Sequence, residues 1–314
     1  MLISIIIPFK ERIPFLLETI RSIRGQVHEN WECILVDDGS SPESLQLILK
    51  VIKDDLRFQL HAKASGIKSG ACASRNYGAS LAKGEGIIFF DSDDILMPEA
   101  LVIREKALES AREMRESFVI SPALKFNDRP ENAENFFSFP YKTMRSDLER
   151  FLRHEIPWTT GSYTWLKAEW ERNPVKWDEK LNGFQDFMLS TQTLLSGIHY
   201  SRIYEADWYY REGDYQKIST RGTHTEESLD RVMELCLTIT NSDGFKNADR
   251  AAQKMFKQVF YNFMINYKGV RKSCKFGFID TRRDCYKNFF WSQTAFSRIP
   301  MLSRLMKKLY DRGL

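Results

Sequence analysis

The most constraining feature of this 314-residue chain is a short apolar run that ends in a cluster of carboxylates. Residues 86–90 are apolar or Gly, and Asp91-Ser92-Asp93-Asp94 follows them directly. Such a run predicts a buried strand, and open α/β sheets bind ligands at the carboxyl ends of their strands. Crowded carboxylates repel one another unless a cation or donor groups neutralise them. The cluster therefore indicates a divalent metal that carries a phosphorylated ligand. A solvated acidic loop that caps the next helix is the competing interpretation.

Strand-like and helix-like segments alternate over the first third of the chain. Apolar, β-branched runs predict strands, and apolar residues at helical spacing predict the helices between them. The predicted strands are 2–7, 31–36, 57–61 and 87–90, and the predicted helices are 13–24, 42–52, 68–81 and 98–114. Pro8 is expected to end the first strand, and Ser41 is the expected N-cap of the second helix. The alternation predicts an α/β fold with a doubly wound, mainly parallel sheet.

A second acidic turn falls at the same predicted edge of the sheet. Asp37 and Asp38 follow the strand over 31–36 and lead into Gly39-Ser40-Ser41. Because the carboxyl ends of parallel strands share one edge, we expect the two acidic turns to lie close together. Turns favour Asp and Gly for conformational reasons alone, so a helix-capping turn is the competing interpretation.

The rest of the chain is less regular. Strand-like pieces at 118–121 and 199–204 and a helix at 187–195 are predicted in the middle section, and helices at 226–240 and 247–267 follow. We place a domain boundary near residue 222. The predicted domains are therefore 1–222, with halves 1–110 and 111–222, and a helical, basic and aromatic region over 223–314.

Composition excludes several classes of protein. With 43% hydrophobic and 28% charged residues, the chain has the composition of an ordinary globular protein. A net charge of +4 is too small to indicate a nucleic-acid partner. The cysteines are odd in number and contain no CxxC pair, which favours a reduced compartment. Because we find neither a signal peptide nor an apolar stretch of membrane-spanning length, we expect a cytoplasmic protein.

Four motifs occur in the order seen in family 2 glycosyltransferases, and the chain resembles that family. The motifs are residues 3–8, Val36-Asp37-Asp38-Gly39-Ser40, Ala73-Ser74-Arg75-Asn76-Tyr77-Gly78, and Lys83-Gly84-Glu85-Gly86 leading into Phe90-Asp91-Ser92-Asp93-Asp94. The resemblance is strong over 1–110, patchier over 150–222 and absent over 225–314. It implies an inverting enzyme with a GT-A-like, Rossmann-type fold, a helical C-terminal extension and a nucleotide diphosphate sugar as donor.

The resemblance also implies a set of donor-binding residues. Asp38, together with Asp37, would accept a hydrogen bond from the nucleotide base, since an ionised carboxylate only accepts. Arg75, with Asn76, would lie near the nucleotide, where a guanidinium pairs well with phosphate. The nucleotide-sugar-binding residues that the resemblance implies are Pro8, Phe9, Glu11, Asp37, Asp38, Arg75, Asn76, Asp91, Ser92 and Arg211. UDP is the nucleotide that we expect.

Mn²⁺ or Mg²⁺ is the cofactor that the resemblance implies. Asp93 would be its principal ligand, Asp91 would reach the metal or the ribose, and His224 would add a further contact. The metal would bridge the two phosphates and stabilise the departing diphosphate. A surface or structural histidine is the competing interpretation of His224.

Asp186 is the candidate catalytic base. An inverting transfer needs a group that takes the proton of the acceptor hydroxyl, and the family usually supplies the Asp of a Glu-Asp pair at a helix start. Here Gln185-Asp186 follows Gly183, so Gln185 replaces the usual Glu and removes a charge. A helix cap is the competing interpretation of Asp186, and Asp178 and Glu179 are nearby alternatives for the base.

The resemblance implies a saccharide or lipid-linked saccharide acceptor in bacterial surface polysaccharide synthesis. Residues 270–314 mix Lys and Arg with apolar and aromatic side chains. This composition is typical of a peripheral contact with the inner face of a membrane, and a helix packed on the catalytic domain explains it equally well. Two further functions stay open: a non-catalytic sugar-nucleotide-binding or scaffold protein, and a sugar nucleotidyltransferase. The second lacks a basic, Gly-rich loop near Lys10.

Overall fold

A computed structural model describes residues 1–63, 66, 68–133, 135–138, 144–212 and 226–257. The chain divides into two compact units, Met1–Met255 and Phe256–Leu314. The first unit continues past the predicted boundary near residue 222 and includes helices α8 (Glu226–Asn241) and α9 (Asp243–Asn247). The functional division at 222 therefore does not coincide with the structural one and stays a prediction. The predicted membrane contact over 270–314 lies outside the described residues.

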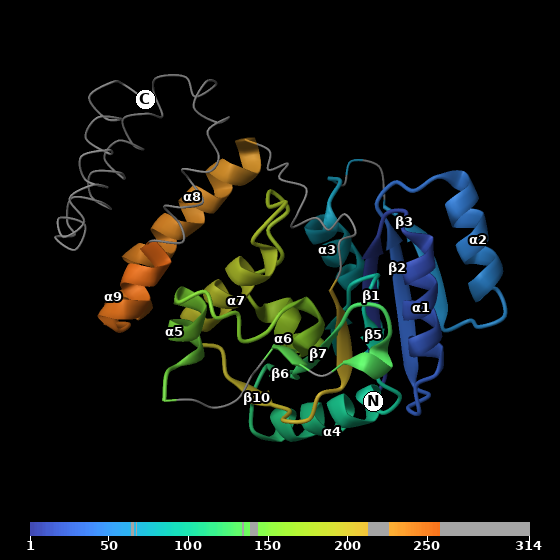
Figure 1. Ribbon diagram of the computed structural model, residues 1–314, viewed down its shortest axis with the longest axis horizontal. Helices are drawn as coiled ribbons and strands as arrows, with labels where there is room; N and C mark the ends of the chain where they lie inside the picture. Colours follow the sequence, from blue (N-terminus) through green and yellow to red (C-terminus); the bar gives the residue numbers. More distant parts are fainter. Residues whose placement is uncertain (64–65, 67, 134, 139–143, 213–225, 258–314) are drawn as a thin grey trace. The chain divides into compact units, whose positions relative to one another are not determined.

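A seven-stranded sheet forms the core of the described part of the first unit (Figure 1). Its strand order is β10-β6-β9-β4-β1-β2-β3. The strands are β1 (Ile3–Phe9), β2 (Trp31–Asp37), β3 (Phe58–Ala62), β4 (Gly86–Phe89), β6 (Phe118–Ile120), β9 (Tyr163–Leu166) and β10 (Tyr200–Arg202). β1 pairs in parallel with β2 and β4, whereas β9 runs antiparallel to β4 and β6. The predicted helix-flanked, mainly parallel sheet is confirmed.

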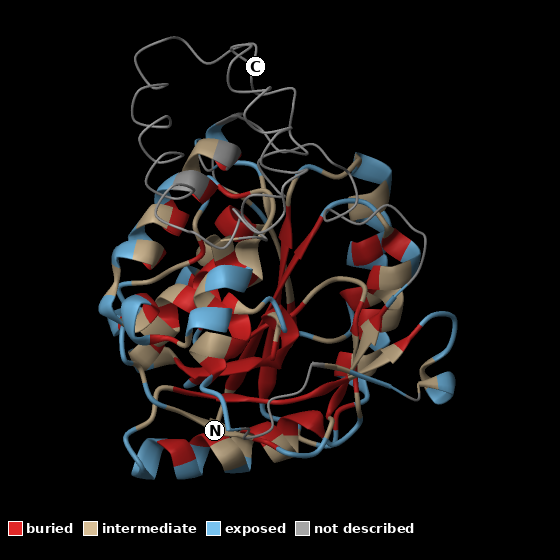
Figure 2. Cartoon of the chain, turned by 60° about the vertical axis from the view of Figure 1, so that its left-hand side comes forward, coloured by how far each residue is buried: buried red, intermediate tan, exposed pale blue. Residues whose placement is uncertain are grey.

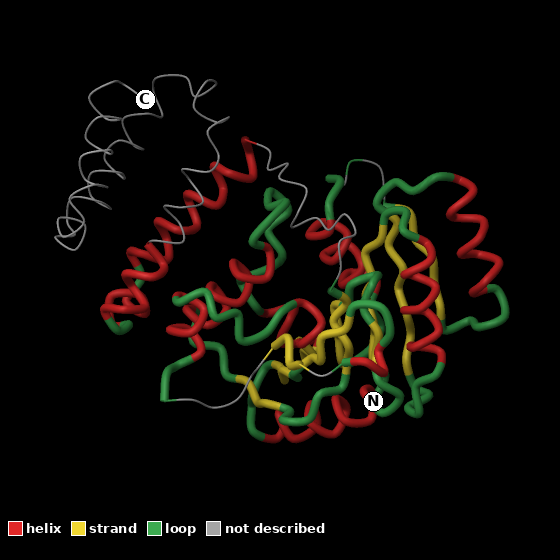
Figure 3. Tube along the Cα trace, viewed as in Figure 1, coloured by secondary structure: helices red, strands yellow, loops and turns green. Residues whose placement is uncertain are grey.

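Helices cover both faces of this sheet (Figure 3). The right-handed crossover rule places α1 (Ile13–Arg24) and α2 (Pro42–Ile52) on one face and α3 (Ala71–Leu81) on the other. Successive side chains of β1 point to opposite faces of the sheet, and their contacts agree with this placement of the helices. Ile5 and Ile7 pack in one apolar cluster with Leu16 of α1, whereas Ile6 lies against Gly78 of α3. β1 and β2 are buried along their whole length (Figure 2), because helices lie on both of their faces.

The sequence predicted the bounds of α1 and α2 correctly. Ser41 caps α2 as expected, since its hydroxyl oxygen accepts a 3.3 Å hydrogen bond from the N–H of Ser44. α3 begins at Ala71 and not at residue 68, and α4 spans Ala100–Glu113 instead of 98–114. Helix ends without a strong capping residue are poorly marked in sequence, and the N-cap residues of α3 and α4 make no side-chain cap.

The prediction that Pro8 ends the first strand is wrong, because β1 continues to Phe9. Pro8 lies opposite Val36 of β2, while the pairing of β1 with β4 stops at Ile6 and Phe89. Since the carbonyl of Ile6 accepts from Phe90, even-numbered residues of β1 present their backbone groups toward β4. A backbone N–H at position 8 would point toward β4, beyond the point where the pairing of β1 with β4 ends. Pro8, which has no N–H, therefore removes no hydrogen bond from this pairing.

The described residues also form a second sheet, which the sequence did not predict. Its order is β5-β11-β7-β8. The strands are β5 (Ile95–Leu96), β7 (Ala123–Phe126), β8 (Asn135–Ser138) and β11 (Trp208–Arg211). A completely buried ion pair supports it: Arg104 of α4 makes bonds of 2.6 and 2.9 Å to Asp207, the residue before β11. β11 brings Arg211 next to the acidic turn at the end of β4.

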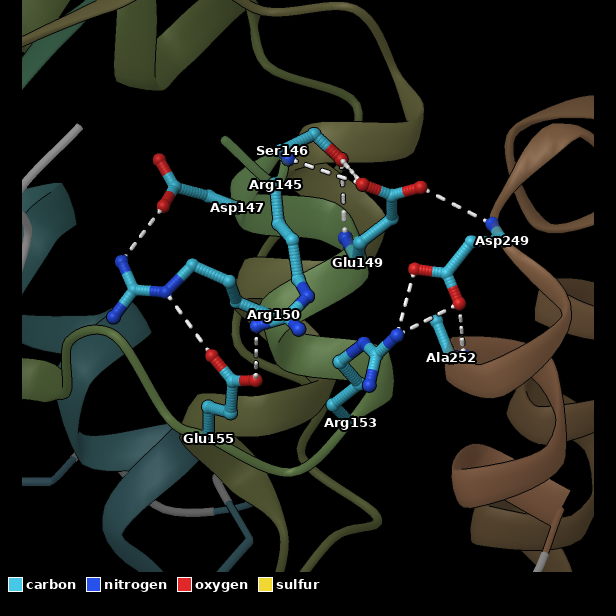
Figure 4. Close-up of polar contacts among 9 residues, drawn as sticks. All are labelled: Arg145, Ser146, Asp147, Glu149, Arg150, Arg153, Glu155, Asp249 and Ala252. Atoms are coloured by element: carbon cyan, nitrogen blue, oxygen red, sulfur yellow. Dashed lines mark hydrogen bonds and ion pairs between the residues drawn. The ribbon is translucent and has the colours of Figure 1, made fainter. Parts of the chain in front are cut away.

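Short helices complete the first unit. They are η1 (Pro130–Asn132), α5 (Asp147–Leu152), η2 (Thr160–Ser162), α6 (Lys167–Arg172) and α7 (Gln185–Leu195). Figure 4 shows how α5 holds the segment after α9: Glu149 accepts from the N–H of Asp249, and Arg153 bonds both oxygens of Asp249 at 2.8 Å. None of the helices in the described part of the chain combines the length and the apolarity needed to cross a bilayer.

Candidate active site

The site lies at the carboxyl ends of β1, β2 and β4, and Arg75 stands at its centre. This arginine of α3 is almost completely buried and its guanidinium lies 4.5 Å from the ring of Trp177. Its Nη2 donates to Asp91 over 2.6 Å, and its Nη1 donates to the side-chain carbonyl of Gln185 over 3.0 Å. One guanidinium therefore joins the acidic turn after β4 to the first turn of α7.

The other two acidic residues of this turn have different partners. Asp93 pairs with Arg12, whose Nη2 lies 2.7 Å from its Oδ2. Asp94 is buried and accepts a 2.9 Å hydrogen bond from the backbone N–H of Arg211. The Arg211 side chain donates to the carbonyl of Asp93 and pairs with Glu18. Protein donors thus supply the neutralisation that crowded carboxylates require.

Asp186 lies in the first turn of α7, beside this network. The N-cap of α7 is Phe184, which makes no side-chain cap, so the interpretation of Asp186 as the helix cap is wrong. The hydroxyl of Thr160 donates to its carboxylate. Burial raises the pKa of Asp186 and Asp91 adds to the rise, while the Arg75 guanidinium opposes it. A carboxylate with a raised pKa suits a general base better than an ordinary surface Asp.

The two alternatives for the base are engaged elsewhere. Asp178 pairs with Arg231 of α8. Glu179 accepts a 2.9 Å hydrogen bond from the amide of Asn76, and the same amide donates to the carbonyl of Trp177 over 2.8 Å. Asn76 thereby holds the segment before α7 against α3. Ser92, which was also predicted to bind the donor, is partly exposed.

The second acidic turn lies next to the start of α3. Asp37 is buried and accepts from the N–H groups of Gly39 and Ser40 at 3.1 and 2.8 Å, which is the geometry of a turn residue. Asp38 accepts from the ammonium of Lys63 and, over 2.9 Å, from the N–H of Gly70. Asp38 is the member of the pair that reaches across to another element, whereas Asp37 shapes the turn.

The loop between β1 and α1 borders the site, because Arg12 of this loop pairs with Asp93. Pro8 and Phe9 are buried at the end of β1. Glu11 accepts from the backbone N–H of Ser41 and, over 2.6 Å, from the hydroxyl of Ser44. These hydrogen bonds lower the pKa of Glu11. The predicted donor-binding role of Glu11 stays a prediction, and its observed contacts fasten the loop to α2.

Sequence reasoning assigned no role to three residues that contact this network: Arg12, Thr160 and Trp177. Tyr210 also borders it. Tyr210 stacks on Phe137 with ring centroids 3.5 Å apart. Burial raises the pKa of Tyr210, and the negative charges of Asp94, Asp91 and Asp93 raise it further. The Tyr210 hydroxyl is therefore close enough to the acidic turn to be affected by its charge. No local motif marks Arg12, Thr160 or Trp177, because each reaches the site through a contact between distant segments.

The donor set fits a divalent metal only in part. In the described residues, no group of three or more His, Cys, Asp or Glu side chains is placed to hold one, and His224 lies outside those residues. Asp91 and Asp93 nevertheless supply two hard carboxylates at one turn. Mg²⁺ and similar ions are often held by one or two carboxylates together with substrate phosphates, so this pair fits a metal that a diphosphate also binds.

The fold is a helix-flanked α/β sheet, and the candidate site lies at the carboxyl ends of its strands, where such folds bind ligands. Residues 4–173, more than half of the chain, match the family model described as glycosyl transferase family 2. The chain belongs to this family, and the resemblance seen in its motifs is confirmed. Among curated relatives, it is 39% identical over 103 residues to the putative colanic acid biosynthesis glycosyl transferase WcaA of Escherichia coli. That match covers 32% of this chain and 36% of WcaA.

Solved structures confirm the predicted GT-A-like fold. S. aureus TarS 1–349 in complex with UDP-GlcNAc has a TM-score of 0.65 and 18% identity, over 92% of this chain and 80% of that one. The mannosyltransferase PcManGT from Pyrobaculum calidifontis, in complex with GDP-Man and Mn²⁺, has a TM-score of 0.53 and 12% identity, over 98% and 87%. In eight curated bacterial glycosyltransferases that this chain matches, the matched region covers 15–46% of the relative's own length.

Proposed function

We propose that this chain transfers a sugar from a nucleotide diphosphate sugar, with UDP as the nucleotide, to a hydroxyl of a saccharide or lipid-linked acceptor, with inversion at the anomeric carbon. One observation carries the proposal. Arg75 bonds both Asp91 and Gln185, so the acidic turn at the end of β4 and the helix that carries Asp186 meet at one guanidinium. A donor site and a base for the acceptor can therefore face one reacting carbon.

On the donor side, Arg75 would bind the diphosphate, since a guanidinium donates two parallel hydrogen bonds to phosphate oxygens. Asp93, together with Asp91, would hold Mn²⁺ or Mg²⁺. When bound, such an ion neutralises the charge that develops on a departing diphosphate. Asp38 would accept from the nucleotide base, which requires it to exchange its present donors for those of the base. The metal and the Arg75 guanidinium would thus offset the negative charges of both the acidic turn and the diphosphate.

On the acceptor side, Asp186 would take the proton of the attacking hydroxyl. Its carboxylate is oriented by the Thr160 hydroxyl, and its pKa is raised by burial. The raised pKa brings its proton affinity closer to that needed at neutral pH. Tyr210, which is only partly buried and stacks on Phe137, would offer an aromatic ring to the apolar face of a sugar beside the same network.

The relatives support particular parts of this proposal. TarS was crystallised with UDP-GlcNAc and with UDP, which supports UDP as the nucleotide. The Mn²⁺ in the PcManGT complex supports a divalent metal. The name of WcaA refers to colanic acid biosynthesis, which supports a role in bacterial polysaccharide synthesis.

Calorimetric titration with UDP, GDP, CDP and dTDP, each with and without Mn²⁺, tests the proposal. We expect Mn²⁺-dependent binding of UDP that Asp93→Ala abolishes. The matched control is Asp54→Ala, which removes an exposed carboxylate at the end of α2. If the folded wild-type chain binds none of these nucleotides, the proposal is wrong. If it binds UDP but transfers no sugar across a panel of saccharide acceptors, a non-catalytic binding protein is the better description.

A further inference from the structure

Two consecutive residues of the β1–α1 loop adopt a backbone conformation that side chains rarely tolerate. Glu11 has φ of 52° and Arg12 has φ of 60°, both in the left-handed region. Such a conformation is energetically costly for a side-chain-bearing residue and persists only where the surroundings hold it. Here the N–H of Glu11 donates to the Ser40 hydroxyl over 2.9 Å, and the Glu11 carboxylate is bonded by Ser41 and Ser44. The loop is therefore held firmly in one conformation.

This conformation points Arg12 at the acidic turn. Its Nη2 donates to Oδ2 of Asp93 over 2.7 Å, and its guanidinium also lies 5.5 Å from the ring of Phe15. The side chains of Arg12 and Asp93 are only 26% and 15% exposed, so solvent and salt screen this pair less than a surface pair. Arg12 and Asp93 are 81 residues apart in sequence, and the loop brings them together.

The pair has a consequence for metal binding. Asp93 is the principal metal ligand under the proposed function. A divalent cation beside Asp93 would lie within a few ångströms of the Arg12 guanidinium, and two positive groups at that distance repel each other. A nucleotide diphosphate adds negative charge at the same place and offsets this repulsion. Metal binding at Asp93 is thus expected to be weak without nucleotide and strong with it.

We propose that Arg12 is a resident counter-ion of Asp93 that keeps a divalent cation from binding until a nucleotide diphosphate arrives. This inference rests on the proposed function and adds an order of binding to it. Arg12 acts through Asp93 and is a positioning residue. The strained loop holds the guanidinium on Asp93 in the absence of donor, and the diphosphate provides the group to which it can turn when the metal binds.

Binding of Mn²⁺ measured by the EPR signal of the free ion tests this proposal in the full chain. For Arg12→Gln we expect Mn²⁺ to bind about tenfold more tightly than in wild type when no nucleotide is present, since one neighbouring charge changes the proton affinity of a carboxylate by at least that factor. The gain in Mn²⁺ affinity on adding UDP should shrink correspondingly. Arg12→Lys keeps the charge and should resemble wild type.

Three further variants make the outcome decisive. Arg24→Gln removes the same charge at the other end of α1, where Arg24 pairs with Asp55, and should leave Mn²⁺ binding unchanged. Asp93→Asn in the Arg12→Gln background should remove the gained Mn²⁺ affinity. Arg12→Gly tolerates the positive φ and serves if Arg12→Gln lowers the melting temperature.

The proposal is overturned if Arg12→Gln, or Arg12→Gly in its place, binds Mn²⁺ no more tightly than Arg24→Gln. If the wild type still shows Mn²⁺-dependent UDP binding that requires Asp93, only the role of Arg12 is then wrong. Absence of any Mn²⁺-dependent nucleotide binding in wild type would overturn both the role of Arg12 and the metal-dependent part of the proposed function.

Discussion

Arg75 donates a 3.0 Å hydrogen bond to the side-chain carbonyl of Gln185, and this bond joins α3 to the first turn of α7. The amide of Gln185 in turn donates to the carbonyl of Leu181 over 3.0 Å, so its orientation is set from both ends. Gln185 accepts from Arg75 without adding a charge. The positive charge of Arg75 therefore acts on Asp91 and Asp186, and a Glu at position 185 would compete for it.

Gln185→Glu is expected to shift the pH dependence of transfer to higher pH. A second carboxylate next to Asp186 makes ionisation of Asp186 more costly, so the pKa of Asp186 rises further above its ordinary value. The base then stays protonated to a higher pH, and the acid limb of kcat/KM moves in the same direction. Gln185→Leu is the control, because it removes the hydrogen bond without adding charge. An unmoved limb in Gln185→Glu would show that Asp186 is not the titrating group.

Asp186→Asn is expected to lower kcat by a factor of about 10²–10⁴, the usual contribution of general-base catalysis. Because Asp186 is proposed to contact the acceptor and not the nucleotide, the affinity for UDP should stay within about twofold of wild type. Steady-state kinetics and calorimetry measure the two quantities. Asp178→Asn and Glu179→Gln are the comparison variants, and a larger loss of kcat in either would transfer the role of base to that residue.

Asp207→Asn is expected to cost about 3–5 kcal/mol of unfolding free energy, because it leaves Arg104 charged and completely buried. The exposed pair of Arg112 and Glu85 is the matched control within the chain, and Glu85→Gln should cost about 1 kcal/mol or less. Urea denaturation measures both. Equal costs for the two variants would mean that water reaches Arg104 in solution.

Gly78→Ala is expected to destabilise the chain by about 1–3 kcal/mol through overpacking. A Cβ at this position of α3 would overlap Cγ2 of Ile6 and would lie 3.2 Å from Cγ2 of Val36. Gly25→Ala, where the nearest atom would be a carbonyl oxygen at 3.4 Å, is the control. A melting temperature equal to wild type in Gly78→Ala would mean that α3 can move away from the sheet without cost.

Most of the fold over residues 1–110 could be predicted from the sequence, because its signals are local. The apolar runs, the helical spacing and the Ser41 cap each depend on neighbouring residues, and they predicted the bounds of α1 and α2 correctly. β9 could not be predicted in this way. Its residues Tyr163–Leu166 are all buried, so no alternation of apolar and polar residues marks them as a strand. Its place between β4 and β6 depends on pairing partners far away in the chain.

The sequence by itself determined which chemical groups gather at the sheet edge, since carboxylates that directly follow a parallel strand must lie at its carboxyl end. Only the tertiary structure decided which partner each charged side chain meets. Arg12 reaches Asp93 across 81 residues, and Arg75 reaches Gln185 across 110. Such pairings depend on loop conformations, among them the left-handed Glu11 and Arg12, and on how α3 and α7 pack. No local pattern of residues specifies these, because they are set by contacts between segments that are distant in the chain.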